Sequence, residues 1–456
     1  MSVLLESNLT NMVTEIVKRE NSYHEAFRAL QESQPNSPGS WLKRLRESAM
    51  ESFQELGFPS VKDEEWKYTN VAPIARIDFK PATWSEVEIP PADEVERFAC
   101  PEAKDSELVF VNGVIRSDLS SLGALPAGVV AMDLSQAISD ERYGEIAWRY
   151  LAQQADHVAN GFVALNTAFI SNGAFVLIPK GVTVKSPLHL LFISDGAQTA
   201  NSPRVLLVAE ENSSATVVES YVGSEDGSYF TNAVVELVLK EGARLEHYKV
   251  QRESARAFHI ATTAADLGPN SSYDVTTINF GAELSRHDVN VTMDHEGAEC
   301  WVDGLYLVTA GQHTDTHSVI DHRKPHCTSH QLYKGILDGK SRAVFNGKVF
   351  VRHDAQKTDA MQTNKNLLLS NEARVDTKPQ LEILADDVKC AHGAAVGQLD
   401  EDELFYLETR GIHHDLARNL LTYGFAEEVI GKIKIESIRT QLDEAVLNRL
   451  NARLEA

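Results

Sequence analysis

Long apolar runs, paired cysteines and basic residues are all scarce in this sequence. No stretch approaches the roughly 20 consecutive apolar residues of a membrane-spanning helix, and the N-terminus shows no hydrophobic leader segment. The four cysteines are scattered along 456 residues, and no two stand in C-x-x-C spacing. This pattern excludes a disulfide scaffold and is typical of free thiols in a reducing compartment. We therefore expect a cytoplasmic protein without a membrane partner.

The shortage of basic residues produces a strongly acidic chain. There are 43 Lys and Arg against 66 Asp and Glu, which gives a formal net charge of −23. A negative field of this kind repels phosphate backbones, so it argues against nucleic acid as a partner. The length predicts more than one domain.

Familiar catalytic signatures are missing as well. The sequence contains no G-x-S-x-G, H-E-x-x-H or G-x-G-x-x-G motif. Gly339, Lys340 and Ser341 resemble the end of a phosphate-binding loop, but Lys334 stands where that loop requires its first glycine. These absences predict a chain with no nucleotide pocket of its own and no familiar hydrolytic nucleophile.

Three zones differ in their hydrophobic periodicity. Residues 1–105 form a mostly helical zone, residues 106–398 alternate in the manner of strands, and residues 399–456 are helical again. Turn signals recur through the middle zone at intervals of 30, 26, 29, 42 and 33 residues, and such a loose period indicates a solenoid. Strand-only repeats favour a β-helix, with a large β-sandwich as the alternative. The residues with these turn signals are Asn212, Gly242, Gly268, Gly297, Gly339 and Glu372.

The C-terminal zone carries apolar stripes at helical spacing. Leu416 and Leu420 lie four residues apart, and a longer stripe follows the same interval. An apolar helix face of this kind must pack against other apolar residues, which belong either to the rest of this chain or to a partner protein. Periodicity alone favours the chain's own body. The longer stripe comprises Ile438, Leu442, Val446, Leu450 and Leu454.

A histidine-rich segment lies within the β-rich zone. His313 and His317 are four residues apart, and so are His326 and His330. Imidazoles at this spacing suit a metal site, and Asp315 and Asp321 are able to orient them. The alternative is a histidine-rich strand face with satisfied neutral imidazoles at a subunit contact.

Cys390 and His392 form a second candidate site near the end of the same zone. In a strand, residues i and i+2 point to one side, about 6–7 Å apart. A thiolate beside an imidazole suits an iron–sulfur cluster or zinc. The alternative is a buried cysteine that acts as a small apolar residue, and a lone C-x-H pair favours that interpretation.

Three segments together resemble the SufB/SufD family of iron–sulfur cluster assembly proteins, most closely its SufD branch. They are AVFNGKVFV, AQKTDAMQTNKNLLLS and ARVDTKPQLEILADDVKCAHGAAVGQLDEDELFYLETRGI. The resemblance implies a right-handed parallel β-helix flanked by helical N- and C-terminal domains. It also implies a non-catalytic scaffold that pairs with SufB through the β-helix, binds the ATPase SufC through the C-terminal helices, and is able to self-associate.

The same resemblance implies roles for single residues. His392 matches the histidine at the SufB–SufD interface, where a transient iron–sulfur cluster is held together with a SufB cysteine, and Cys390 is second in importance. Ala391 and Ala395 stand where the family has serine and threonine, so two hydroxyls are expected to be missing near the site. An empty site is expected in the isolated chain.

Overall fold

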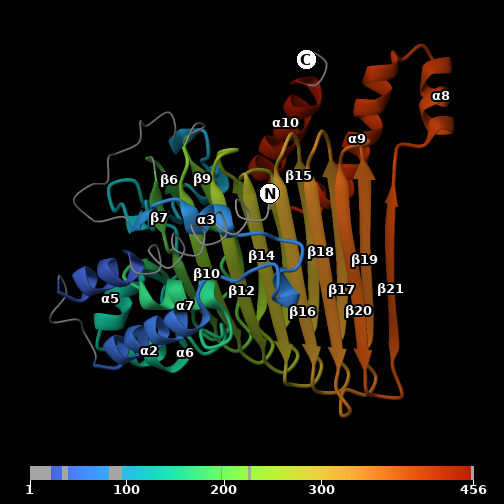
Figure 1. Ribbon diagram of the computed structural model, residues 1–456. Coiled ribbons are helices and arrows are strands. Elements are labelled where there is room, and N and C mark those ends of the chain that lie inside the picture. Colours follow the sequence, from blue (N-terminus) through green and yellow to red (C-terminus); the bar gives the residue numbers. More distant parts are fainter. Residues whose placement is uncertain (1–21, 33–39, 82–94, 197, 224–226, 453–456) are drawn as a thin grey trace.

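The computed structural model describes residues 22–32, 40–81, 95–196, 198–223 and 227–452. Two long β-sheets face each other and wind together as a solenoid (Figure 1). From β8 (Arg204–Ala209) onward, successive strands alternate between the sheets, and each strand up to β19 (Asp359–Leu368) pairs in parallel with the strand two positions further along the chain. One coil therefore consists of two strands. The prediction of a mainly β solenoid flanked by helices is confirmed.

We call one sheet the even-numbered sheet, because from β8 onward its strands carry even numbers, and the other the odd-numbered sheet. The even-numbered sheet begins at an antiparallel β4–β5 pair and ends at β20. Its strands in spatial order are β4 (Val130–Asp133), β5 (Gly173–Ile178), β8 (Arg204–Ala209), β10 (Phe230–Leu239), β12 (Phe258–Leu267), β14 (Leu284–Met293), β16 (His313–His322), β18 (Arg342–Val351) and β20 (Arg374–Ile383), with β7 (Thr199–Asn201) and β1 (Lys80–Pro81) attached beside β10.

The odd-numbered sheet begins at an antiparallel β3–β2 pair and ends at β21. Its strands in spatial order are β3 (Val114–Ile115), β2 (Glu107–Val111), β6 (Leu188–Ser194), β9 (Ser214–Gly223), β11 (Arg244–Arg252), β13 (Ser272–Asn279), β15 (Glu299–Val308), β17 (Thr328–Leu337), β19 (Asp359–Leu368) and β21 (Lys389–Gly397).

The middle strands are buried on both faces. All ten residues of β10 are buried, and its sequence FTNAVVELVL is rich in β-branched and apolar side chains. Parallel sheets with both faces covered favour such sequences. The register also stacks equivalent residues, since Val235 pairs with Thr263, Thr263 with Val289, and Val289 with Ser318.

A row of left-handed turns joins the two sheets along one side. Each turn has one residue with positive φ, and its amide N–H donates to a carbonyl oxygen in the next coil. The spacings are 30, 28, 27, 29 and 31 residues, so the row repeats once per coil. Its members are Asn212, Gly242, Asn270, Gly297, His326 and Lys357.

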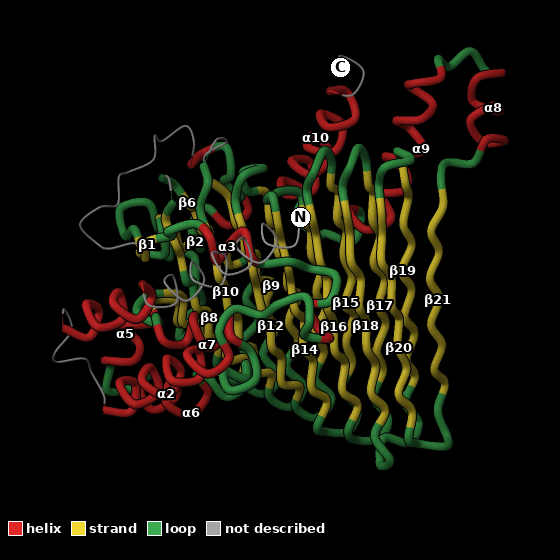
Figure 2. Tube along the Cα trace, in the orientation of Figure 1, coloured by secondary structure: helices red, strands yellow, loops and turns green. Residues whose placement is uncertain are grey.

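Helices close the first coils of the solenoid (Figure 2). The longest is α2 (Ser40–Leu56), which packs against α7 (Gly161–Ala168), a helix buried along most of its length. Three helices lie between β4 and β5, inside the stretch that was expected to form strands. Within this stretch, residues 137–151 have the amphipathic sequence AISDERYGEIAWRYL, whose apolar residues recur at helical spacing. Ala137, Ala147 and Leu151 of this segment are buried. The short elements here are η1 (Glu64–Trp66), α3 (Ala72–Arg76), η3 (Pro101–Ala103), α5 (Leu134–Ser139) and α6 (Gly144–Tyr150).

The C-terminal helices are α8 (Glu401–Thr409), α9 (His414–Ile430) and α10 (Glu436–Ala452). The first four residues of the longer predicted stripe lie on α10 and are buried against the outer face of the odd-numbered sheet, where they meet Tyr248, Val250 and Leu305. The fifth, Leu454, lies outside the described residues. The expectation that this face packs on the chain's own body is therefore confirmed for α10. Among the described residues no helix is long and apolar enough to cross a membrane.

Candidate functional site at the open end of the solenoid

The last coil leaves the solenoid open at one end. Among the described strands, β20 pairs only with β18 and β21 pairs only with β19, so each carries a free backbone edge (Figure 1). Along β21 every residue is at least partly exposed, whereas the inward residues Phe345 and Val349 of β18 are buried. A free edge beside an uncovered core face is a surface that another chain commonly covers.

Cys390 and His392 lie on the inward side of this open coil. In register, Cys390 pairs with the buried Ala360 and His392 with the buried Gln362 of β19. Cys390 is half-buried and packs against the main core, whereas His392 is exposed. Within the described chain, the imidazole of His392 takes part in no hydrogen bond or ion pair. The two predicted ligands therefore share one face, and one of them is free to contact another molecule.

The thiol of Cys390 is less acidic than a free thiol. Burial, and next the negative charge of Asp359, raise the pKa of Cys390. The thiolate that binds iron or zinc is consequently a minor species at neutral pH in the isolated chain. A bound cation or a partner's positive charge would reverse that balance.

Ala391 and Ala395 lie on the opposite face of β21. Their register partners are Met361 and Lys365, which are exposed, and strand alternation directs all of these side chains away from the interior. The expectation that these two alanines remove hydroxyls from the vicinity of the site is therefore wrong. Hydroxyls at these positions would point away from Cys390 and His392.

A layer of buried side-chain amides, which we call the amide floor, lies on the inward faces of β17 and β19 next to the open coil. Gln362 Nε2 donates to Gln331 Oε1 (2.6 Å), and Gln331 Nε2 donates to Ser318 Oγ (2.7 Å). Thr377 donates its hydroxyl to Asn364 Oδ1 (2.8 Å). Gln362 Oε1 is buried and has no hydrogen-bond partner among the described residues, although it lies beside the register position of His392. Sequence analysis missed this floor, and the available signal was polar residues at alternate positions of β19.

His313 and His317 lie together on the outer face of β16. Thr69 contacts both His313 (2.9 Å) and Asp315 (2.6 Å). His317 Nε2 lies 3.1 Å from Asp315 and its Nδ1 lies 3.3 Å from Glu65. Burial alone would lower the pKa of His317, but the charge of Asp315 and the hydrogen bonds to both carboxylates raise it to about 9. These imidazoles therefore join the N-terminal segment to the solenoid.

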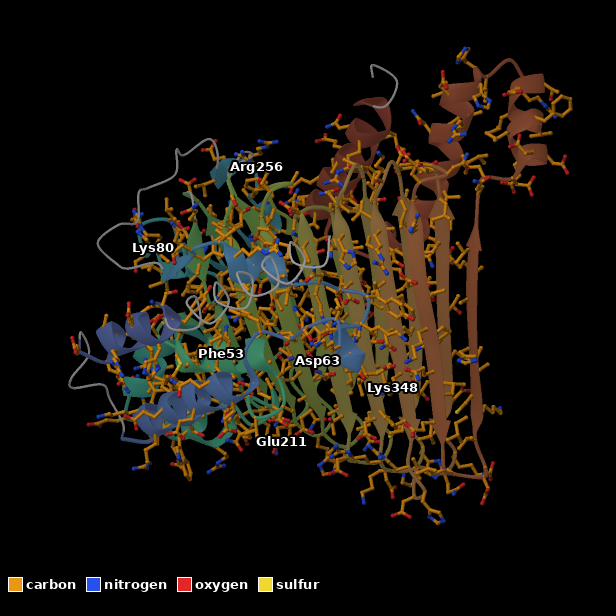
Figure 3. All side chains as sticks on the ribbon, viewed as in Figure 1. Phe53, Asp63, Lys80, Glu211, Arg256 and Lys348 are labelled. Atoms are coloured by element: carbon orange, nitrogen blue, oxygen red, sulfur yellow. The ribbon has the colours of Figure 1, made fainter. Side chains whose placement is uncertain are left out.

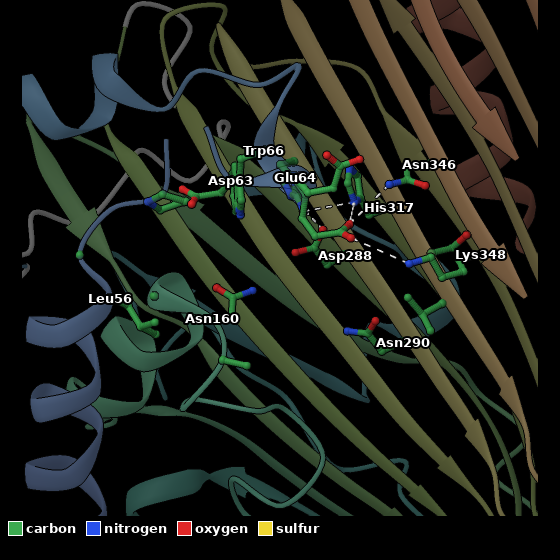
Figure 4. Close-up of a pocket in the computed structure, with 18 residues that line it drawn as sticks. Leu56, Asp63, Glu64, Trp66, Asn160, Asp288, Asn290, His317, Asn346 and Lys348 are labelled. Carbon is green, nitrogen blue, oxygen red and sulfur yellow. Dashed lines mark hydrogen bonds and ion pairs between the residues drawn. The ribbon is translucent and has the colours of Figure 1, made fainter. Parts of the chain in front are cut away.

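A pocket of about 520 Å³ lies beside His317 (Figure 4). Asp63, from the loop between α2 and η1, and Lys348 of β18 both line it, and Figure 3 labels the two residues on the whole structure. Both basic side chains in its wall are paired within the chain, because Arg286 pairs with Asp288 (2.9 Å) and Asp315 (3.0 Å), and Lys348 lies 3.9 Å from Glu65. The pocket thus lies at the contact between the segment that leads from α2 to η1 and the outer face of the even-numbered sheet.

His326 and His330 are placed elsewhere. His326 has a φ of 61° and occupies the left-handed turn position that Gly242 and Gly297 fill in other coils. His330 lies on the odd-numbered sheet and stacks on Trp301, with ring centroids 5.9 Å apart. The described residues hold no group of three or more His, Cys, Asp or Glu that would suit a metal ion. The structure thus does not bring the four predicted histidines together.

An exposed apolar surface lies on α8 and the first half of α9. Phe405 is 66% exposed and Tyr406 56%, while Leu416 and Leu420 are 51% and 46% exposed. We call these four residues the α8–α9 surface. Within the C-terminal zone, α8 and the first half of α9 thus expose these four side chains, whereas the stripe of α10 (Ile438, Leu442, Val446 and Leu450) is buried and Leu447 of α10 is 43% exposed.

The chain matches two family models that together span most of its length. The model described as "SUF system FeS cluster assembly, SufBD core domain" matches residues 192–425, and the "SufBD protein N-terminal region" model matches residues 17–190.

Similarity to individual curated proteins is also nearly full-length. A SufBD family protein of iron–sulfur cluster assembly from Synechocystis sp. is 39% identical over 89% of this chain and 91% of its own length. The iron–sulfur cluster assembly protein SufD of Escherichia coli is 32% identical over 89% and 92%, respectively. Protein ABCI7, chloroplastic, of Arabidopsis thaliana is 32% identical over 96% and 94%. The similarity therefore includes the N-terminal segment, the solenoid and the C-terminal helices.

Proposed function

Because this chain belongs to the SufBD family of iron–sulfur cluster assembly proteins, we propose that it is the SufD-type scaffold subunit of a SUF complex with SufB and the ATPase SufC. The membership itself confirms the family resemblance that the motifs predicted. The proposal rests chiefly on one observation. The two candidate ligands, Cys390 and His392, lie on a last strand whose edge and inward face are uncovered.

The cluster is the cargo of this scaffold, and this chain supplies only part of its binding site. Iron–sulfur clusters are usually held by four protein ligands, whereas the open coil offers one imidazole and one thiol. A second chain must therefore contribute the remaining ligands. We assign that role to SufB, whose solenoid would meet this one along the free edges of β20 and β21. A second copy of this chain is the alternative occupant of the same edge.

We assign SufC to the α8–α9 surface. Four large apolar side chains are exposed there, on the two helices that follow the last strand, and exposed apolar surface of this kind commonly marks protein contacts. In this arrangement the chain itself is not an enzyme, and ATP hydrolysis by SufC would be transmitted through α8 and α9 to the adjoining coil.

The test is anaerobic cluster reconstitution in the complex of all three proteins. We expect His392→Ala to leave complex formation intact and to lower the yield of the cluster, measured by its visible absorbance. Cys390→Ala should have a smaller effect. His353→Ala is the matched control, because its side chain is 84% exposed in the turn after β18.

Two outcomes would contradict the proposal. If neither SufB nor SufC is retained by the purified chain, the scaffold role fails. If His392→Ala assembles clusters at the unaltered rate, the chain is a structural subunit without a ligand role.

A further inference from the structure

Gln362 of β19 belongs to the amide floor but leaves one of its hydrogen-bonding atoms unused. The side chain is 1% exposed, and its Nε2 donates to Gln331 Oε1 (2.6 Å). Its Oε1 is also buried and accepts no hydrogen bond from the described residues. A buried acceptor without a donor is unfavourable, and most such groups in folded proteins have a partner. The oxygen therefore marks a position where a donor is missing.

The amide group of Gln362 is held in one orientation. Gln331, which accepts from it, is itself fixed because its Nε2 donates to Ser318 Oγ (2.7 Å). On the opposite sheet, a Cβ atom at Gly347 of β18 would lie 2.3 Å from Gln362 Nε2, so an alanine there would displace the amide. The nitrogen thus faces β17, and the oxygen, which lies on the other side of the amide carbon, is turned away from that strand.

His392 is the neighbour that is able to supply the missing donor. β19 lies between β17 and β21, and His392 is the register partner of Gln362 on β21. Register partners on adjacent strands are about 4.8 Å apart and point to the same face of the sheet. The two side chains therefore start side by side on the inward face. No ligand has to enter from solvent, since the donor belongs to the next strand of the same sheet.

The imidazole of His392 is free to turn toward this oxygen. It is exposed, and within the described chain it takes part in no hydrogen bond or ion pair. The inward positions on either side of it, Cys390 and Ala394, carry small side chains. Rotation about the Cα–Cβ and Cβ–Cγ bonds of His392 is thus sufficient to bring a ring nitrogen beside the amide of Gln362.

The neighbouring polar side chains already have other acceptors. Thr377 on β20 donates its hydroxyl to Asn364 Oδ1 (2.8 Å), and Asn366 Nδ2 donates to the same oxygen (2.6 Å). Asn364 Nδ2 donates to the carbonyl oxygen of Tyr333 (3.3 Å). Besides His392, the alternative donor for Gln362 Oε1 is a buried water molecule.

We propose that Gln362 is a positioning residue for His392, whose imidazole donates one N–H to Gln362 Oε1 when it turns inward. A neutral imidazole carries a proton on only one of its nitrogens, so this hydrogen bond selects the tautomer. The other nitrogen then presents its lone pair to an iron atom, as in most histidine ligands of metals. The part of this inference that concerns iron rests on the proposed function, whereas the hydrogen bond does not.

The experiment is nitrogen-15 solid-state NMR of the histidine-labelled chain, sedimented in its cluster-free complex with SufB at about pH 8, where a free imidazole is neutral. The signals of His392 are those that His392→Ala removes. Gln362→Met removes the acceptor with little change in volume, and Gly347→Ala displaces the amide without altering its chemistry. Thr377→Val is the matched control, because it removes a different hydrogen bond of the amide floor. If SufB is not retained, the chain alone is measured in the same way.

We expect a single tautomer of His392, with widely separated Nδ1 and Nε2 shifts, in the unaltered protein and in the Thr377→Val variant. In the Gln362→Met and Gly347→Ala variants the two shifts should move toward their mean, because the tautomers then exchange. Identical His392 shifts in the unaltered protein and in Gln362→Met would overturn the inference and assign the buried oxygen to a water molecule.

Cluster retention by the same variants separates this inference from the proposed function. If His392 binds iron, Gln362→Met should weaken retention of the cluster about tenfold or more, measured as loss of visible absorbance to a chelator. A change of tautomer with unaltered retention would support the role of Gln362 and contradict the ligand role of His392. Unaltered tautomer with weaker retention would overturn the role of Gln362 alone.

Discussion

At the scale of single residues, two cysteines occupy the same column of the solenoid. Cys300 pairs with Ser329, Ser329 with Ala360, and Ala360 with Cys390, so the two thiols are equivalent positions three coils apart. Cys300 is fully buried and burial strongly raises its pKa, whereas Cys390 is half-buried on the open strand. Position along the solenoid, not chemical type, makes one thiol accessible and the other inert.

Alkylation measures this difference directly. At pH 8 iodoacetamide should modify Cys390 in the folded chain and leave Cys300 intact, as read by mass spectrometry of the digested protein. The rate at Cys390 should rise with pH, because burial and Asp359 raise its pKa. Asp359→Asn should accelerate the reaction at a fixed pH. Equal rates at the two cysteines, with the protein still folded, would show that the last coil is covered.

A buried ion pair provides a second residue-scale prediction. Arg204 donates Nε to Glu236 (3.1 Å), and neither side chain has exposed surface. Glu236 also accepts from the backbone N–H groups of Ala152 (2.8 Å) and Gln154 (2.9 Å). Glu236→Ala should lower the free energy of unfolding by about 3–5 kcal/mol, because it leaves a buried guanidinium without its counter-ion. Urea unfolding followed by circular dichroism measures the loss.

The matched control is the pair of Arg149 and Glu145 on α6. The two groups are 2.9 Å apart but are 58% and 72% exposed. Glu145→Ala should change the free energy of unfolding by no more than about 0.5 kcal/mol. Similar losses for the buried and the exposed pair would contradict the role assigned to burial.

At the scale of elements, the contact of η1 with β16 should make stability depend on pH. The pKa of His317 is raised to about 9 in the folded chain, above its ordinary value near 6.5. A raised pKa means that the protonated form stabilises the fold fully below pH 6.5, and that this stabilisation disappears as pH rises through 9. The pKa of Asp315 is lowered, so its contribution disappears only under acid conditions.

His317→Gln should therefore flatten the stability curve between pH 6.5 and 9.5. The difference from the unaltered chain is at most about 3 kcal/mol at pH 6. It is measured by urea unfolding across that range, with His353→Gln as the exposed control. An unchanged slope in the His317 variant would mean that this imidazole is not charged in the folded protein.

The C-terminal helices should separate stability from partner binding. Leu442 of α10 is fully buried, so Leu442→Ala should cost about 2–5 kcal/mol of unfolding free energy. Leu416→Glu with Leu420→Glu on α9 should change the unfolding free energy by no more than about 0.5 kcal/mol. The double variant should nevertheless lose retention of SufC in a pull-down, while the Leu442 variant retains it at low temperature. Retention of SufC by the double variant would place the ATPase elsewhere.

Element-scale patterns explain what sequence analysis predicted and what it missed. The stripe on α10 was predictable, because helical spacing places Ile438, Leu442 and Val446 on one face whatever lies beneath. The irregular interval of 42 residues among the predicted turns has a simple cause. Gly297 lies in a turn from the even-numbered to the odd-numbered sheet, whereas Gly339 lies in a turn from the odd-numbered back to the even-numbered sheet. Turn residues indicate that the chain reverses, but not on which side.

The interior of the solenoid was less predictable. Glu219, Lys249 and His259 are buried inside it, although alternation with apolar neighbours makes such residues look solvent-facing. Since both faces of these strands are covered, alternation does not distinguish inside from outside. The same ambiguity applies to the four histidines, because His317 and His330 lie on different sheets that only the coil register relates.

At the scale of the whole molecule, stability should fall toward the open end. In a solenoid each coil is stabilised by its neighbours, so a terminal coil with one neighbour opens more easily. The strands from β10 to β17 have neighbours on both edges, whereas β21 pairs only with β19 among the described strands. Amide hydrogen exchange should therefore be slowest in β12 to β15 and fastest, among the long strands, in β20 and β21.

Adding SufB should change this gradient at one place. If its solenoid covers the free edge, the amides of β20 and β21 gain protection while those of β12 to β15 remain as they were. Val396→Lys, at a 46% exposed inward position of β21, should abolish the gain without altering exchange in the isolated chain. Lys340→Ala, in the turn before β18 with its side chain 74% exposed, is the control. Protection that spreads evenly over all coils would instead indicate global stabilisation, and protection confined to α8 and α9 would place SufB on the helices.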